Sequence, residues 1–181
     1  MPAVLHNVLS RLRERGVRAV GSSEPDGAAS AFDARDYQLI VFGSGVVGPV
    51  SQRLRREFGL RNPSVRFLDA FGPIAAGQVA AALSDRGALI DDVRVVDEES
   101  GWRVRATALA SCTVRIDLYH LTESEELIVE ALAELPVTTG PVEWRGESEH
   151  GAKGRMLVVS AGREGEDPEF HTHRLTQAAA S

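Results

Sequence analysis

Cysteine is nearly absent from the sequence, which has one such residue, Cys112, among 181. A single cysteine excludes an intramolecular disulfide and any zinc or iron–sulfur site held by several cysteines of this chain. Long hydrophobic runs are also missing, since no segment approaches the roughly 18–20 apolar residues that cross a bilayer. Segment 1–15 is interrupted by charged and polar side chains and cannot form the core of a signal peptide. We therefore expect a cytoplasmic protein that has no membrane partner.

Charge is unevenly distributed along the chain, whose net charge is −6. Residues 1–90 carry 11 arginines and 8 acidic residues, whereas residues 91–181 carry 9 basic and 18 acidic residues. Neither half has the dense basic stripe with interleaved aromatic residues that is typical of nucleic-acid binding, so we expect no nucleic-acid partner. The opposite charges of the halves indicate two units that attract each other or a second copy of the chain. Two ordinary surfaces that differ by chance would give the same counts.

Residues 1–88 alternate between helix-like and strand-like patterns. Helices are predicted at 4–12, 26–34, 47–58 and 73–83, and strands at 17–21, 37–42 and 64–70. The mostly apolar run Tyr37–Phe42 is typical of a strand buried on both faces of a parallel sheet. Because strands that alternate with helices form βα units, we predict a small α/β domain here, with a flavodoxin-like or Rossmann-like parallel sheet.

Residues 91–176 change to the alternating pattern of half-buried strands. Seven strands are predicted near 93–95, 102–108, 114–119, 127–132, 142–146, 155–161 and 170–175, with glycine-containing turns at 99–101, 138–140 and 150–152. This pattern predicts an all-β domain, an immunoglobulin-like antiparallel β-sandwich, joined to the first domain by a short linker at Gly87–Asp92. Residues 123–134 would also form a helix by propensity, with Ser124 as its N-cap, although we prefer a strand. Residues 177–181 are expected to form a disordered tail.

The segment Gly43–Gly48 (GSGVVG) matches G-x-G-x-x-G between a predicted strand and a predicted helix, and Asp69 ends the next strand. In dinucleotide-binding folds such glycines let the backbone approach a pyrophosphate, and the acid accepts hydrogen bonds from ribose hydroxyls. That motif normally lies on the first strand, however, and only one helix follows Asp69 before the β-rich half. We favour a tight turn whose glycines serve backbone geometry. The alternative is an NAD or NADP site formed by Gly43, Gly45, Gly48 and Asp69.

Other reactive side chains do not form a complete catalytic pattern. His171-Thr172-His173 places two imidazoles on one face of a strand, and His120 or His150 could join them to bind zinc. No Glu-x-x-His motif or cysteine accompanies them, so we expect no metal site. Ser44 and Cys112 lack a His and an Asp positioned nearby by pattern, so we predict no catalytic residues. The core of the second domain is expected to include Trp102, Trp144 and Cys112.

Three stretches of the first half resemble an atypical response-regulator receiver, or pseudo-receiver, domain of flavodoxin-like fold: VLHNVLSRLRERGVRAVGSS (4–23), FDARDYQLIVFGSG (32–45) and NPSVRFLDAFG (62–72). In a receiver, the strand that aligns with 37–42 ends in the aspartate that accepts the phosphoryl group. Gly43 stands at that place here, so the resemblance implies a domain that is not phosphorylated. The resemblance begins at the family's first helix, so the central strand that precedes this helix in the family is not matched. That strand would lie upstream, be replaced by a rearranged sheet, or come from another chain.

The second half resembles the immunoglobulin-like sandwich of flagellar hook-capping proteins. TVRIDLYHLTESEELIVEALAELPVTTGPVEWRGE (113–147) and GAKGRMLVVSAG (151–162) carry the resemblance. Tyr119-His120-Leu121 stands at the family's strand corner, Leu135-Pro136 after its hairpin and Trp144-Arg145-Gly146 at a strand end. The resemblance implies a hairpin across residues 123–134 and a domain that works through contacts.

These features together predict a non-enzymatic protein that acts by protein–protein contact, in assembly or regulation, and that associates with itself. Two alternatives remain open. One is a dinucleotide-binding oxidoreductase, or a subunit of one, that uses the GSGVVG turn. The other is a regulatory pseudo-receiver that works without phosphorylation.

Overall fold

The computed structural model describes residues 2–98, 101–122, 126–147 and 155–175. The chain divides into two compact units, Met1–Asp85 and Arg86–Ser181. The predicted turns at 99–101 and 150–152 fall wholly or partly outside the described residues, and so does the predicted tail at 177–181. None of the described helices is long and apolar enough to span a membrane.

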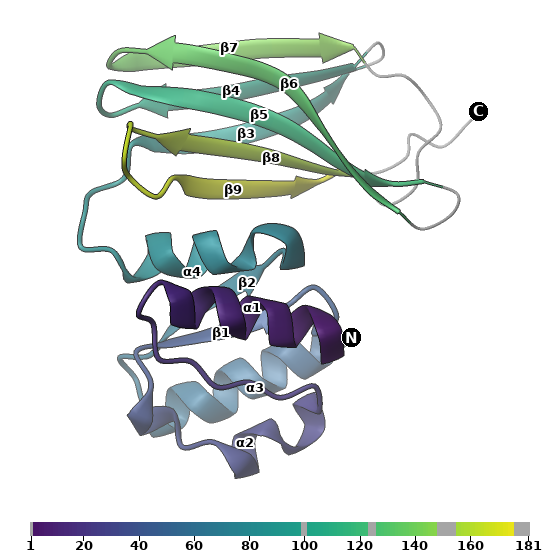
Figure 1. The fold of residues 1–181 in the computed structure, drawn as a ribbon, viewed down its shortest axis with the longest axis vertical. Coiled ribbons are helices and arrows are strands. Elements are labelled where there is room, and N and C mark those ends of the chain that lie inside the picture. The colour runs from purple at the N-terminus through teal and green to yellow at the C-terminus, as the bar shows by residue number, and fades with distance from the viewer. Residues whose placement is uncertain (1, 99–100, 123–125, 148–154, 176–181) are drawn as a thin grey trace. The chain divides into compact units, whose positions relative to one another are not determined.

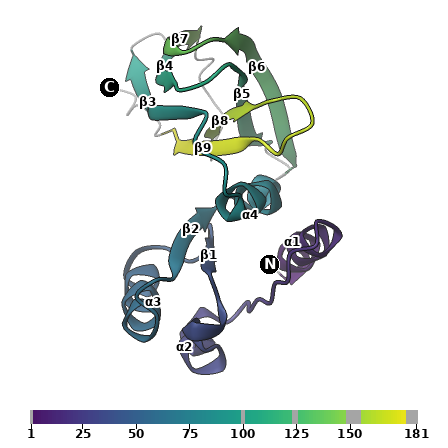
Figure 2. The ribbon, with the colours of Figure 1, turned by 90° about the vertical axis from the view of Figure 1, so that its left-hand side faces the viewer.

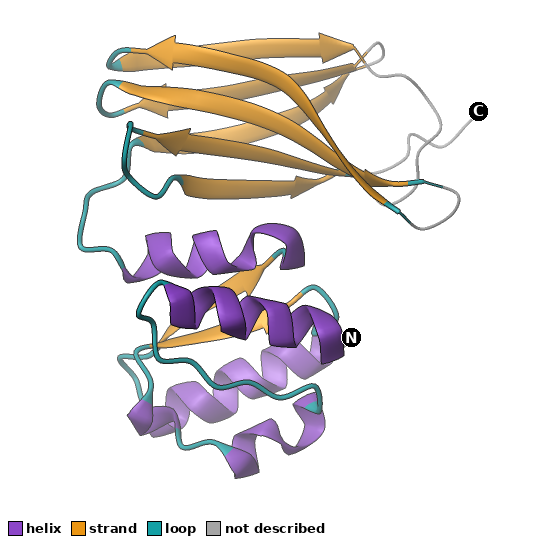
Figure 3. Cartoon of the chain, in the orientation of Figure 1, coloured by secondary structure: helices purple, strands orange, loops and turns teal. Residues whose placement is uncertain are grey.

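The first unit is a small α/β structure (Figures 1 and 3). Its helices are α1 (Pro2–Glu14), α2 (Ala28–Ala31), α3 (Gly48–Arg61) and α4 (Ala75–Leu83), and its strands are β1 (Leu39–Gly43) and β2 (Arg66–Ala70). The two strands pair in parallel, with Leu39 opposite Arg66 and Gly43 opposite Ala70. Within the described residues these two strands are the whole parallel sheet. The predicted α/β class is therefore confirmed, but a sheet of this size does not establish a flavodoxin-like or Rossmann-like domain.

Helices cover both faces of this strand pair, with α3 on one side and α1 and α4 on the other (Figure 2). On the α3 side, Phe42, Leu54 and Phe58 form a buried cluster against which other strand residues pack. On the other side, Leu12 of α1 and Val79 of α4 are buried together. The alternation of side chains along the strands places Ile40 and Phe67 against the first cluster and Leu39 and Leu68 against the second, which explains why neighbouring strand residues are apolar.

The predicted strand at 17–21 is wrong, because this segment belongs to no strand. Gly16, with φ +73°, ends the first helix, and the Val17 N–H donates a hydrogen bond to the Leu12 carbonyl at 2.9 Å. At its far end, a Cβ added to Gly21 would lie 2.7 Å from Cδ1 of Leu5. The segment thus runs back along α1. It forms no strand because no other strand in the described residues lies beside it to complete its hydrogen bonds.

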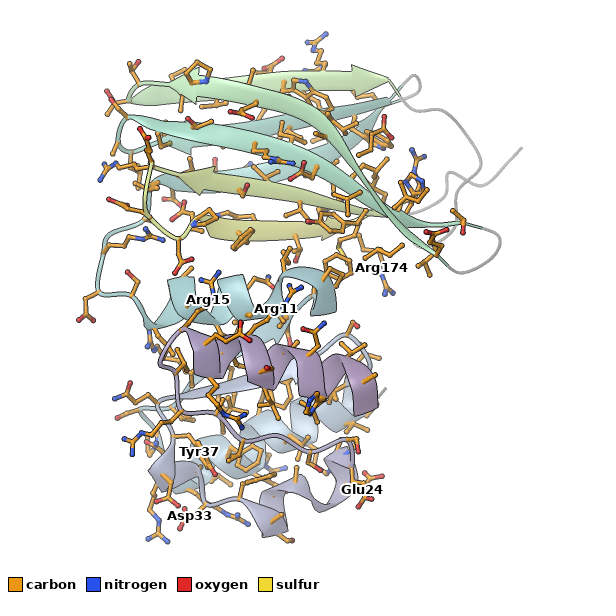
Figure 4. The ribbon with its side chains drawn as sticks, in the orientation of Figure 1. Arg11, Arg15, Glu24, Asp33, Tyr37 and Arg174 are labelled. Carbon is orange, nitrogen blue, oxygen red and sulfur yellow. The ribbon has the colours of Figure 1, made fainter. Side chains whose placement is uncertain are left out.

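The predicted helix at 26–34 is shorter than expected, since only α2 is helical and short 3₁₀ turns flank it at Pro25–Gly27 and Ala34–Asp36. Asp33 caps the start of the second 3₁₀ turn, because its side chain accepts a hydrogen bond from the Arg35 backbone N–H at 3.1 Å. The Arg35 guanidinium also bonds the Asp33 side chain, and these hydrogen bonds lower the pKa of Asp33 from 3.8 to about 2. Asp33 and Tyr37 are marked in Figure 4.

The second unit consists of two antiparallel sheets, as predicted for a β-sandwich (Figure 3). Its strands are β3 (Ile90–Glu98), β4 (Gly101–Ala108), β5 (Cys112–Leu121), β6 (Leu127–Val137), β7 (Gly140–Glu147), β8 (Met156–Gly162) and β9 (Glu169–Arg174). One sheet has the order β3-β4-β7 and the other β6-β5-β8-β9. All seven predicted strands are confirmed. The helical alternative for 123–134 is wrong from Leu127 onward, because β6 pairs with β5 along its length, and residues 123–125 lie outside the described residues.

The core of this unit lies between the two sheets and includes Ile116, Leu118 and Leu157. Trp102 and Cys112 are buried, and Trp144 packs against the same cluster, which confirms the core prediction for these residues. Burial raises the pKa of the Cys112 thiol. The ring of Trp144 lies over Gly146, two residues further along β7, where an added Cβ would overlap it.

The predicted linker at Gly87–Asp92 is largely part of the second unit. Leu89 and Ile90 are buried in its core. The Glu169 carboxylate accepts hydrogen bonds from the backbone N–H groups of both, at 3.0 and 2.7 Å. One carboxylate of β9 thereby satisfies two amides that β3 would leave unpaired at its start.

Candidate functional site

The glycine turn lies at the carboxyl end of β1. The Val46 N–H donates to the Gly43 carbonyl at 2.9 Å, and α3 begins at Gly48, whose φ is +59°. A left-handed φ favours glycine, so backbone geometry accounts for Gly48. It does not account for Gly43, whose φ is not positive and whose added Cβ would meet no atom within 4 Å. The surface of the turn at Gly43 is therefore open.

Asp69 lies at the same edge of the strand pair, since it is opposite Phe42 in the parallel register. Its Oδ1 accepts a hydrogen bond from Nη2 of Arg55 at 2.5 Å. The Arg55 guanidinium stacks over the rings of Phe42, at 4.8 Å, and Phe67, at 5.4 Å. The structure thus brings Gly43 and Asp69 together at the carboxyl edge of the strands, where ligands of open α/β sheets bind. A ribose hydroxyl at Asp69 would share that carboxylate with Arg55.

The histidines singled out from the sequence lie on two different strands. His171 and His173 are half-buried on β9, His120 lies on β5, and His150 falls outside the described residues. Nε2 of His171 is 3.8 Å from Oε1 of Glu169. Among the residues that the structure describes, no three His, Cys, Asp or Glu side chains gather at one point as metal ligands do.

An ion-pair network on the outer face of the β3-β4-β7 sheet was not singled out from the sequence. Glu143 of β7 accepts hydrogen bonds from Arg105 at 3.1 Å and from Arg145 at 3.3 Å. The hydrogen bond from Arg105 is the main reason why the pKa of Glu143 is lowered. Arg103 forms an ion pair with Glu98 on the same face. Since each arginine already has a carboxylate partner, we interpret this network as a solvated surface.

A second feature that sequence reasoning missed is an exposed apolar patch at the end of the β5–β6 hairpin. It consists of Leu121, Leu127, Ile128 and Val129, with between 40% and 48% of each residue exposed. Leu121 is opposite Leu127, and Val129 is opposite Tyr119 on β5. A strand buried on one face hides every second side chain, whereas here the five consecutive residues 127–131 are all exposed.

Three of the four patch residues, Leu127, Ile128 and Val129, lie on an edge strand, because β6 is the first strand of the sheet β6-β5-β8-β9. The far half of β6 carries features that discourage another strand from pairing there. Pro136 has no N–H to donate, Glu134 is charged and exposed, and a bulge interrupts the register opposite Ile116 and Asp117. The near half, Leu127–Val129, has none of these features, and the exposed anion Glu130 follows it directly. The free edge is therefore protected at one end and open at the other.

No family model matches the chain, and no curated protein shows significant similarity to it.

Proposed function

We propose that the chain is a non-enzymatic protein that acts through contact with protein partners, further copies of itself included. The exposed patch on the β5–β6 hairpin is the observation that carries this proposal. Clustered exposed apolar side chains mark protein–protein interaction sites, and an open strand edge offers backbone groups to which a partner strand can bond.

The size of the patch sets the expected strength of association. Full burial of one large apolar side chain contributes about 1.5–3 kcal/mol, so covering the exposed half of four contributes about 3–6 kcal/mol. Association costs about 4–15 kcal/mol in lost translational and rotational freedom. The patch therefore needs backbone hydrogen bonds as well, and we expect association that depends on protein concentration.

The first unit supports the same proposal. β1 has an apolar sequence, but Val41 at its centre is exposed, and among the described strands β2 alone pairs with it. Strands of parallel sheets are ordinarily covered on both faces and paired on both edges unless they lie at the border. This strand offers a second place at which another chain can add to the fold.

Sedimentation velocity at increasing protein concentration tests the proposal. We expect the wild-type chain to self-associate and the double variant Leu127→Ser/Val129→Ser to remain monomeric, because it removes apolar surface that association would cover. The matched control is Leu60→Ser, which changes another exposed leucine on α3 and is expected to associate like the wild type. Circular dichroism checks that all three chains are folded. A wild-type chain that stays monomeric at every concentration would contradict self-association.

A second candidate function, dinucleotide binding, is favoured by the position of Gly43 and Asp69 at the carboxyl edge of β1 and β2. A thermal-shift titration with NAD⁺, NADH, NADP⁺ and NADPH tests it. A ligand at 100 times its dissociation constant stabilises by about 2.7 kcal/mol, which raises Tm by about 5–10 °C. Under this hypothesis the shift appears for one dinucleotide and is lost in Gly45→Val. The absence of any shift would leave the glycines as a turn.

A further inference from the structure

We propose that segment 17–21 of one copy adds to the free edge of β6 in a second copy as an antiparallel strand, with Arg18 opposite Glu130 and Val20 opposite Ile128. This inference rests on the proposed self-association and names the two surfaces that meet.

The donor segment belongs to no helix or strand of the structure. Its ends lie beside Leu12 and Leu5 of α1, which are separated by about 10.5 Å along a helix that rises 1.5 Å per residue. The four steps from Val17 to Gly21 cover that distance at about 2.6 Å per residue, which is more than in a helix and less than the 3.2–3.4 Å of a β-strand. To become a strand, the segment has to extend further, but it loses no regular structure when it does so.

The donor segment also has free hydrogen-bonding groups and exposed side chains. Within the described residues, the backbone groups of residues 18–21 make no hydrogen bond. Arg18 and Ala19 are exposed, and Val20 is 60% exposed. The side chain of Arg18 forms no ion pair with any described residue. An extended apolar segment with one unpaired cation is thus available to a partner.

The acceptor edge offers the complementary chemistry. Ile128 and Val129 are exposed apolar residues of the unprotected half of β6, and Glu130 follows them as an exposed anion. Glu130 is opposite Leu118 on β5, and its carboxylate has no ion pair among the described residues. The open edge therefore combines a short apolar run with one unpaired anion.

An antiparallel register matches these two segments residue by residue. With Arg18 opposite Glu130, Val20 falls opposite Ile128, Ala19 opposite Val129 and Val17 opposite Ala131. Opposite charges and apolar pairs that face each other across strands are stabilising. A shift by one residue in either direction would instead place Arg18 opposite Val129 or Ala131, which separates the two charges.

The chain that binds the free edge of β6 is a second copy of this protein. Every copy carries both the donor segment 17–21 and the acceptor edge of β6, and these two surfaces have opposite charge. Each copy can donate one strand and accept one. Two copies that exchange segments reciprocally form a closed dimer, and copies that do not exchange reciprocally repeat into rings or linear chains.

Charge reversal tests the proposal by sedimentation velocity. Arg18→Glu and Glu130→Arg are each expected to raise the dissociation constant of self-association about five- to thirtyfold, because an attractive cross-strand pair becomes a repulsive one. An equimolar mixture of the two variants restores association, and so does the double variant in one chain. Arg11→Glu is the matched control: it reverses an exposed arginine of α1 outside the segment, marked in Figure 4, and leaves the dissociation constant unchanged.

The outcomes separate this inference from the proposed function. If both single variants associate like the wild type while Leu127→Ser/Val129→Ser does not, the chain self-associates through the hairpin but segment 17–21 is not its partner. If the single variants weaken association and neither the mixture nor the double variant recovers it, the register is wrong. Amide hydrogen exchange is a direct second measurement, since residues 18–21 become protected only in the assembled protein.

Discussion

Replacing Ile116 with alanine is expected to lower the free energy of unfolding of the second unit by about 2–5 kcal/mol. Ile116 is fully buried at the centre of β5, opposite Ala133 on β6 and Val159 on β8. The shorter side chain loses the transfer free energy of the removed carbons and leaves a cavity that strands paired on both sides cannot close. Urea unfolding followed by tryptophan fluorescence measures the change, because both tryptophans of the chain lie in this unit.

The matched control is Val96→Ala, which also shortens a β-branched side chain of the second unit, at a residue that is 47% exposed and lies outside the proposed interface. We expect it to alter the free energy of unfolding by less than about 0.5–1 kcal/mol, as is usual for surface positions. Equal losses in the two variants would mean that the packing described for β5 is wrong.

Replacing Glu169 with alanine is expected to cost about 2–5 kcal/mol in the free energy of unfolding of the same unit. The carboxylate accepts hydrogen bonds from the N–H groups of Leu89 and Ile90, and both residues are buried. Without the carboxylate these N–H groups have no acceptor, and each unsatisfied buried group costs about 1–3 kcal/mol. Glu169→Gln keeps one oxygen that can accept a hydrogen bond and should lose less.

The control for this prediction is Glu166→Ala. Glu166 also contacts the segment that begins the second unit, through an ion pair with Arg86 at 3.0 Å, but its side chain is 39% exposed. A partly exposed ion pair contributes only about 0–1 kcal/mol. If the two alanine variants lose the same stability by urea unfolding, the role assigned to Glu169 is wrong.

The strands of the second unit could be predicted because burial on one face leaves a period of two in the sequence. In β4, Trp102, Val104 and Ala106 are buried while Arg103 and Arg105 point outward to the ion-pair network. That alternation is local information, and it is enough to place a strand and to tell its two faces apart. It does not tell which strand will lie at the edge of a sheet.

Features that depend on contacts between residues far apart in the sequence could not be predicted. Segment 17–21 has a strand-like composition, but a strand also requires a partner, and no local pattern shows that the partner is missing. The exposure of Leu127, Ile128 and Val129 follows in the same way from the place of β6 at the edge of its sheet.

The candidate dinucleotide site could be predicted in part. The motif GSGVVG correctly placed a turn between a strand and a helix, and Asp69 was correctly placed on the next strand. The contact between Asp69 and Arg55 could not be predicted, because it depends on the register that sets β1 against β2 and on the packing of α3 over both.

The contact between Trp144 and Gly146 has a consequence for how this sequence can change over time. The indole ring occupies the space that a Cβ at position 146 would need, so any residue other than glycine requires the ring to move. Substitutions at the two positions are therefore coupled: a larger residue at 146 is tolerated more easily once Trp144 has been replaced by a smaller residue. In a library of random variants, survivors that have lost the glycine should also have lost the tryptophan.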